Sequence, residues 1–226
     1  MLENVKNLVA HDHGNTFKVI LNHLKSLGYH VYYKVLNALD YGVPQKRERI
    51  IIVGFINDVN FKFPAPLYGK TPALSDILED NVDKKYYVND RIRNSRLERI
   101  KDKNYPKPYI SHENMAGAIT PHPYSSALRA GASANYILIN DERRPTEREL
   151  LRIQGFPDSY KIIGSYSKIK HQTGNSVAVP VIKAVARQMI DALIEYDLCS
   201  SSNKTHEERN TNTYSFGEQL TFDFYN

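Results

Sequence analysis

The sequence predicts an α/β protein that holds part of a doubly wound sheet together with a small, irregular, mostly β domain. A helix, a strand, a loop and a second strand follow one another between residues 15 and 55, and this order is typical of α/β folds. The second strand, residues 49–55, is almost purely apolar, as expected for a strand that is buried on both faces of a sheet. From residue 57 onward prolines interrupt the chain, which predicts short strands and loops.

The helix of this first region is expected to begin at Asn15 or Thr16 and to end at Gly28. Its apolar residues recur with the period of an α-helix: Phe17, Ile20, Leu21, Leu24 and Leu27. Residues 29–36 then predict a strand, and residues 37–44 predict a loop before the buried strand. An ordinary doubly wound sheet has several more strand–helix units, and the residues before the helix leave no room for them. We therefore expect a partial sheet.

The middle of the chain, residues 57–140, has the signals of an irregular domain. Its prolines are Pro64, Pro66, Pro72, Pro106, Pro108, Pro121 and Pro123. Residues 83–107 carry nine cations against four anions, enough to account for the whole net charge of +5. Tyrosines are interleaved with these cations, a combination that suits a phosphate backbone and exposed bases, although a solvated surface helix can have the same composition.

The last third of the chain predicts two helices and a tail. Thr146 and Glu149 form a capping box that begins a short helix, which Gly155 ends. Residues 180–194 are apolar over most of a helical circumference, so we expect this helix to be buried against a larger body. Beyond Asp197 the chain is polar and predicts a mobile tail.

Four short motifs occur in order along the chain. They are Glu3-Asn4-Val5, Gln45-x-Arg47-x-Arg49, Arg148-Glu149 followed by Gln154-Gly155-Phe156-Pro157, and Gly174-Asn175-Ser176-Val177. In this order and spacing they resemble the C-terminal half of the bacterial DNA (cytosine-5) methyltransferases, and residues 3–55 are similar in particular to the HhaI-type modification enzymes. The resemblance covers most of residues 2–195 and thins in the middle domain.

The resemblance implies a Rossmann-like catalytic domain joined to a target-recognition domain. Residues 1–57 are expected to form the C-terminal part of the catalytic domain, and residues 58–160 the target-recognition domain. Residues 161–197 return to pack on the catalytic domain, and residues 198–226 form the polar tail. The implied substrate is double-stranded DNA, methylated within a restriction–modification system of the bacterial cytoplasm.

The reaction of this family explains why a carboxylate and arginines are needed. Carbon 5 of cytosine takes up a methyl group only after a thiolate has added at carbon 6. An acid at ring nitrogen 3 and a cation at oxygen 2 stabilise the charge that develops. The resemblance implies that Glu3 faces nitrogen 3 and the exocyclic amine, that Arg49 faces oxygen 2, and that Arg47 supports the site or the flanking phosphate. The cytosine must first be flipped out of the duplex.

Other residues are implied to bind the cofactor and the DNA. The family places the turn of Asn175, Ser176 and Val177 beside S-adenosylmethionine. Gln45, Thr120 and Arg129 are the candidate DNA-binding residues. The family carries a Thr-Leu pair ahead of its last motif, whereas here Thr120 precedes a proline.

Three of these residue types also have ordinary structural uses. A glutamate such as Glu3 is most often solvated. Arg49 could form an ion pair at the start of the strand, and Asn175 could cap the N-terminus of a helix.

Two segments of the family are absent from these residues: the Gly-rich cofactor loop and the Pro-Cys-Gln segment that carries the nucleophile. Cys199 is the single cysteine and lies in the polar region after the last helix, where nothing nearby lowers its pKa. We therefore expect this chain to be inactive alone. It would be the C-terminal portion or a split subunit that needs a complementary N-terminal half for the thiol and for most contacts to S-adenosylmethionine. The alternatives are a non-catalytic DNA-binding or regulatory protein and an inactive gene fragment.

Several other classes are disfavoured by composition. The longest apolar runs are too short to span a membrane. His11-Asp12-His13 has no further clustered ligand, so no metal site is predicted. A single cysteine is consistent with a reducing cytoplasm.

Overall fold

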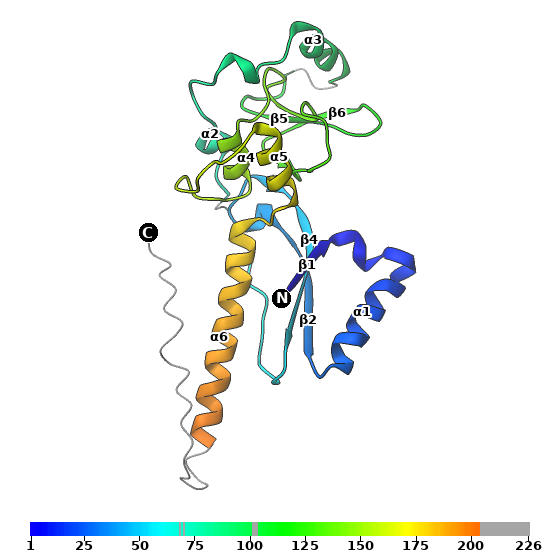
Figure 1. Ribbon diagram of the computed structural model, residues 1–226, viewed down its shortest axis with the longest axis vertical. Helices are drawn as coiled ribbons and strands as arrows, with labels where there is room; N and C mark the ends of the chain where they lie inside the picture. The colour runs from blue at the N-terminus through cyan, green and yellow to red at the C-terminus, as the bar shows by residue number, and fades with distance from the viewer. Residues whose placement is uncertain (68, 70, 101–103, 204–226) are drawn as a thin grey trace.

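The computed structural model describes residues 1–67, 69, 71–100 and 104–203, which form two lobes stacked along the long axis (Figure 1). The helices and strands are β1 (Leu2–Val5), α1 (Asn15–Ser26), β2 (His30–Asn37), β3 (Gln45–Lys46), β4 (Glu48–Phe55), α2 (Leu74–Ile77), α3 (Asp90–Arg99), β5 (Ile110–Glu113), β6 (Ile119–His122), β7 (Ser125–Ser126), β8 (Ile137–Ile139), α4 (Glu147–Ile153), α5 (Tyr166–Asn175) and α6 (Val179–Asn203). We call β1, α1, β2, β4 and α6 the sheet lobe, and α2 to α5 with β5 to β8 the small lobe.

The sheet lobe is built on the strand order β1-β4-β2, and both outer strands run antiparallel to β4. A doubly wound sheet is mainly parallel, so the parallel part of the prediction is not found among the described strands. β1 was not predicted at all. Its register places Glu3 opposite Ile51, while β2 places Leu36 opposite Arg49. Directly opposed residues share a face, so Glu3 lies on the same face as Ile51. Arg49 is two residues from Ile51 on β4 and points to that face as well.

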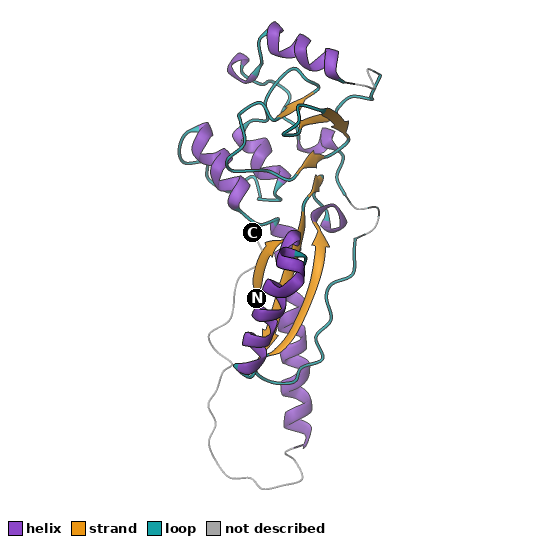
Figure 2. Cartoon of the chain, turned by 90° about the vertical axis from the view of Figure 1, so that its right-hand side faces the viewer, coloured by secondary structure: helices purple, strands orange, loops and turns teal. Residues whose placement is uncertain are grey.

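Helices cover both faces of β4 (Figures 1 and 2). On one face, Phe17 of α1 packs with Ile50 and Ile52. On the other face, Val181 and Val185 of α6 belong to the same core cluster as Ile51 and Val53 of β4, among others. The prediction that the apolar run at residues 49–55 is buried on both faces is confirmed.

The first helix follows its sequence signals closely. α1 begins at Asn15, after Gly14 with φ +86°, and Gly28 with φ +87° follows its end at Ser26. Positive φ is the conformation that glycine adopts without strain. β2 begins and ends one residue later than predicted.

The small lobe contains the antiparallel sheet β6-β5-β8, and α3 is tied to it by a buried arginine. Arg96 is 1% exposed. Its Nε donates to Asp141 Oδ1 at 3.0 Å and its Nη2 to Ser111 Oγ at 2.7 Å. A short parallel bridge, β3 with β7, joins the two lobes.

Five of the nine cations in the basic segment at residues 83–107 form ion pairs within the small lobe, whereas no ion pair is seen for Lys84 and Arg91 among the described residues. These ion pairs are Lys85–Asp83, Arg93–Glu142, Arg96–Asp141, Arg96–Glu113, Arg99–Glu113 and Lys107–Glu142. Lys101 and Lys103 lie outside the described residues. α3 matches the alternative of a solvated surface helix: apart from the buried Arg96 and the half-buried Ile92, its residues are exposed.

α6 is the predicted apolar helix, and it is longer than predicted. It runs to Asn203, so residues 198–203 are helical rather than part of a tail, and residues 204–226 lie outside the described part. Its outer side carries exposed apolar side chains, among them Ile190, Ile194 and Leu198. The described residues therefore cover only one side of α6. No helix in this part of the chain is long and apolar enough to span a lipid bilayer.

Candidate functional site

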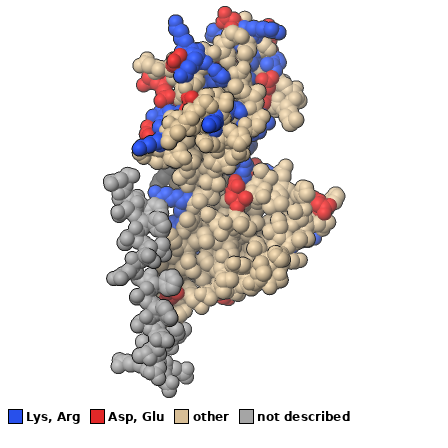
Figure 3. Space-filling model, in the orientation of Figure 1, with Lys and Arg blue, Asp and Glu red and all other residues tan. Residues whose placement is uncertain are grey.

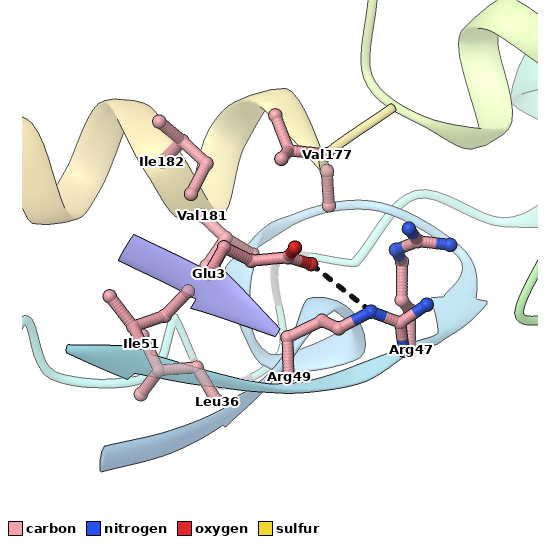
Figure 4. A pocket seen from close by; sticks show the side chains of 9 residues that line it. Glu3, Leu36, Arg47, Arg49, Ile51, Val177, Val181 and Ile182 are labelled. Carbon is pink, nitrogen blue, oxygen red and sulfur yellow. Dashed lines mark ion pairs between the residues drawn. The ribbon is translucent and has the colours of Figure 1, made fainter. Parts of the chain in front are cut away.

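A cavity lies between the α6-facing side of the sheet and the beginning of α6 (Figure 4). Its lining residues are Glu3, Leu36, Arg47, Arg49, Ile51, Val177, Ala178, Val181 and Ile182. The walls are apolar except for the carboxylate and the two guanidinium groups. Four segments of the chain, at residues 3, 36, 47–51 and 177–182, thus converge on one small, charged pocket.

Glu3 and Arg49 form an ion pair at this cavity. The distance from Arg49 Nε to Glu3 Oε1 is 3.1 Å, and both side chains are partly buried (Figure 4). Arg49 also donates from Nη1 to the carbonyl oxygen of Glu48 at 2.8 Å. The ion-pair alternative for Arg49 is therefore realised, and it is the same contact that would hold Arg49 in a catalytic pocket.

Burial and the ion pair act on Arg49 in opposite directions. Burial lowers the pKa of Arg49, and the neighbouring Glu3 carboxylate opposes this change. Glu3 Oε1 is buried and faces Arg49 Nε at 3.1 Å, outside the alignment of a regular hydrogen bond. Because a carboxylate has several acceptor sites, Glu3 can accept further N–H donors beside Arg49.

Arg47 lies deeper, with 4% of its surface exposed. Its guanidinium donates to the carbonyl oxygens of Leu128 at 3.2 Å, Gly174 at 3.4 Å and Ser176 at 2.7 Å. Burial, and next the positive charge of Arg49, lower the pKa of Arg47 to about 10. The guanidinium is engaged with backbone carbonyls, so the structure favours support of the site over contact with a flanking phosphate.

Gln45 is fully buried, so it offers no exposed group to DNA in this structure, and its predicted DNA-binding role stays a prediction. Its Nε2 donates to Ile153 O at 2.9 Å and to Gln154 Oε1 at 3.0 Å, and its Oε1 accepts from Leu128 N at 3.1 Å. The amide is thus fully used in joining the two lobes. Gln45 was assigned to DNA binding because the sequence alone does not show how deeply its polar side chain is buried.

The predicted cofactor residues contribute unequally to the cavity. Val177 lines it, whereas Asn175 and Ser176 do not. Asn175 is the last residue of α5, so its alternative role as a helix N-cap is wrong. Its exposed amide lies 3.4 Å from His171 Nδ1, and Ser176 Oγ donates to Thr173 O at 2.9 Å.

Thr120 and Arg129 are both exposed on the small lobe, and neither lines the cavity. Lys and Arg side chains, with Asp and Glu among them, are visible on this lobe in Figure 3. Thr120 pairs with His112 across β5 and β6. The guanidinium of Arg129 lies 4.9 Å from the centre of the Tyr136 ring, and its Nη2 lies 3.5 Å from His112 Nε2. His112 therefore connects the two candidates, and neither His112 nor Tyr136 was singled out from the sequence.

Among the described residues, no group of three or more His, Cys, Asp or Glu side chains is arranged to hold a metal ion.

The chain is similar to a family of DNA methylases and to several of its members. A family model described as C-5 cytosine-specific DNA methylase matches residues 1–191. Type II methyltransferase M.HaeII of Haemophilus aegyptius is 52% identical over 195 residues, covering 85% of this chain and 61% of the relative. M.NgoBI of Neisseria gonorrhoeae is 50% identical over 189 residues (83% and 59%), and M.HhaI of Haemophilus parahaemolyticus 36% over 200 residues (82% and 61%).

The chain spans about 60% of the length of these curated relatives. Among solved structures, the Entamoeba histolytica methyltransferase EhMeth has a TM-score of 0.60 at 19% identity, covering 84% of this chain and 62% of that one. The S. pombe Dnmt2 methyltransferase has a TM-score of 0.56 at 18% identity, with 84% and 65% covered. At this identity the likeness concerns the fold alone.

Proposed function

The chain belongs to the C-5 cytosine-specific DNA methylase family, and we propose that it is the C-terminal portion of a type II DNA (cytosine-5) methyltransferase of a restriction–modification system. It methylates carbon 5 of a cytosine flipped from a specific site in double-stranded DNA, in the bacterial cytoplasm. The observation that carries this proposal is the pairing of Glu3 with Arg49 in a cavity that also contains Val177. One wall of the base pocket and one wall of the cofactor site thereby meet.

The charged groups of this cavity, which by itself has room for about one water molecule, suit the chemistry of a cytosine bound against them. Ring nitrogen 3 and the exocyclic amine face the two oxygens of the Glu3 carboxyl group, and oxygen 2 faces Arg49. With Glu3 protonated, its proton passes to nitrogen 3 as a thiolate adds to carbon 6, which leaves Glu3 as the carboxylate paired with Arg49, and the guanidinium stabilises charge on oxygen 2. S-adenosylmethionine, when bound, supplies the methyl group. Val177 gives its site an apolar wall and Asn175 an exposed amide.

The thiol has to come from outside these 226 residues. Cys199, the single cysteine, lies eighteen residues beyond Val181 on α6, or about 27 Å along the helix at 1.5 Å per residue. Val181 lines the cavity, so Cys199 is too distant to attack a base held there. The proposal therefore includes a complementary N-terminal portion, in the same polypeptide or in a partner chain, that carries the nucleophile and most of the cofactor contacts.

Complementation tests the proposal. The chain is purified together with the part of M.HaeII that it does not match, which the family resemblance predicts to carry the Pro-Cys-Gln nucleophile. Transfer of labelled methyl from S-adenosylmethionine to plasmid DNA is then measured. We expect transfer from the mixture and none from either portion alone. A mixture that binds DNA without transferring methyl would favour a non-catalytic DNA-binding protein, and bisulfite sequencing of the product would give the target site.

A further inference from the structure

Arg47 lies where three separate segments of the chain meet. They are the beginning of β4, the loop at residues 128–132 in the small lobe, and the turn at residues 174–177 before α6. Its guanidinium bonds to one carbonyl of the loop, that of Leu128, and to two of the turn, those of Gly174 and Ser176. Arg49, two residues further along the chain, lines the same cavity.

The loop and the turn are also in direct backbone contact. A Cβ atom built on Gly174 would lie 2.2 Å from the amide nitrogen of Ala130, so only glycine permits this approach. Lys170 of α5 donates from Nζ to Ala130 O at 3.2 Å. Gln45, which precedes Arg47 by two residues, accepts from Leu128 N. The loop therefore cannot shift without displacing the turn or breaking these bonds.

We propose that Arg47 is a positioning residue that couples the loop at residues 128–132 to the turn at residues 174–177 and to Arg49. Contact of the small lobe with DNA through Arg129, in this loop, then sets the position of Val177 and of the Arg49 guanidinium in the cavity. The proposal rests on the proposed function, because it takes DNA to be the ligand of the small lobe.

The planar guanidinium explains why an arginine is needed. It presents several N–H donors in fixed directions, so one side chain can bond to carbonyls of two segments at once, whereas a lysine ammonium is a compact point charge on a flexible stem. Coupling between sites requires a physical element that both sites bias. Here that element is the set of carbonyls held by Arg47.

Hydrogen–deuterium exchange of the full chain tests the coupling without any ligand. In R47K, which keeps the charge, peptides covering residues 48–51, 128–132 and 174–178 should all exchange about tenfold faster, because hydrogen bonds to a charged donor are lost. Peptides from α1 should be unchanged. R144K is the matched control, since Arg144 also donates to a carbonyl, Lys85 O at 2.7 Å, but away from the junction. Faster exchange in only one of the three segments would overturn the proposal.

The second arm adds sonicated genomic DNA as a mixed-sequence duplex probe. In the unsubstituted chain, DNA should slow exchange at residues 128–132 and also at residues 48–51 and 174–178. In R47K the slowing should be confined to residues 128–132. Slowing that reaches all three segments in R47K would show that the signal does not need Arg47. If DNA slows no segment of the unsubstituted chain, the DNA-binding function fails, and the ligand-free exchange still decides the role of Arg47.

A further variant covers the case in which R47K does not fold. K170M removes a tether of the loop on the α5 side and leaves Arg47 in place. Transmission through Arg47 predicts faster exchange at residues 48–51 as well, a strand for which no bond to Lys170 is seen. An effect of K170M that stays within residues 128–132 would contradict the proposal.

Discussion

At the scale of single residues, the cavity pairs the Glu3 carboxylate with the Arg49 guanidinium, whose Nε lies 3.1 Å from Glu3 Oε1. Taking two charges out of water carries a desolvation cost that the pairing has to offset. The carboxylate keeps acceptor sites for a further N–H donor, and a cytosine amine is such a donor. Glu3 is thus the residue at which a function in binding or catalysis is most directly tested.

We expect Glu3→Gln to lower the turnover of the complemented protein by about 100-fold, the lower end of what general acid catalysis contributes. The amide still reaches the base but has no proton to give. DNA affinity, measured by fluorescence anisotropy, should change far less than turnover. Glu48→Gln is the matched control, because Glu48 is on the neighbouring strand and pairs with Lys6 at the surface. Equal losses of turnover and affinity would indicate that Glu3 is structural.

A second residue-scale prediction concerns His112. Burial lowers its pKa, and the positive charge of Arg129 lowers it further. The unfolded chain, with an ordinary histidine pKa near 6.5, therefore takes up the proton first as the pH falls. The stability that depends on neutral His112 is complete above about pH 6.5 and is lost as the pH falls through the lower pKa of the folded protein.

The melting temperature should accordingly fall between pH 7.5 and pH 5, and His112→Gln should make this fall shallower. Differential scanning fluorimetry across that range measures both. His23→Gln, in α1 of the other lobe, is the control and should leave the acid dependence unchanged. A slope that is identical in the chain and in His112→Gln would show that His112 does not govern it.

The motifs indicated which residues belong to the site, but they did not indicate how deeply each side chain is buried. Glu3 and Arg49 were expected to lie in one site, and they line the same cavity, while their role at a cytosine stays a prediction. Gln45 and Arg47 belong to the same motif and have the same polar character, yet both are buried among backbone carbonyls. Their partners come from segments about 80 to 130 residues away, and no local pattern reports such contacts.

At the scale of elements, the helices and strands that were predicted correctly are those with a strong pattern in their own residues. The period of apolar residues and Gly28 gave α1, and the apolar run gave β4. β1 is short and partly polar, and it exists through its pairing with β4. α3 has no apolar face because a buried arginine, Arg96, anchors it, so the usual signature of a packed helix is missing.

The junction of α5 with the loop of the small lobe gives an element-scale prediction. Gly174→Ala places a methyl group 2.2 Å from Ala130 N, and two backbone segments must separate to admit it. Overpacking of this kind costs about 1–3 kcal/mol, which corresponds to a fall in melting temperature of roughly 2–12 °C for a domain of this size. Gly131→Ala is the control, since nothing lies within 4 Å of its added Cβ. Equal melting temperatures for the two variants would contradict the close approach.

At the scale of the whole molecule, the site is built from one side only. Glu3, Arg49 and Val177 line the cavity, while α6 leaves Ile190, Ile194 and other apolar side chains exposed on its outer side. Exposed apolar stripes and edge strands are surfaces that proteins normally cover. A complementary portion that brings the thiol would have both a chemical and a packing reason to bind.

The position of Cys199 makes this arrangement testable. It is exposed on α6, about 27 Å along the helix from Val181 at 1.5 Å per residue. Cys199→Ser should therefore leave methyl transfer by the complemented protein unchanged, whereas serine in place of the cysteine of the complementary portion should abolish it. The unsubstituted chain alone should transfer no labelled methyl to DNA. Robust transfer by the chain alone that Cys199→Ser removes would show that the helix end reaches the base, and that the thiol does not have to arrive from elsewhere.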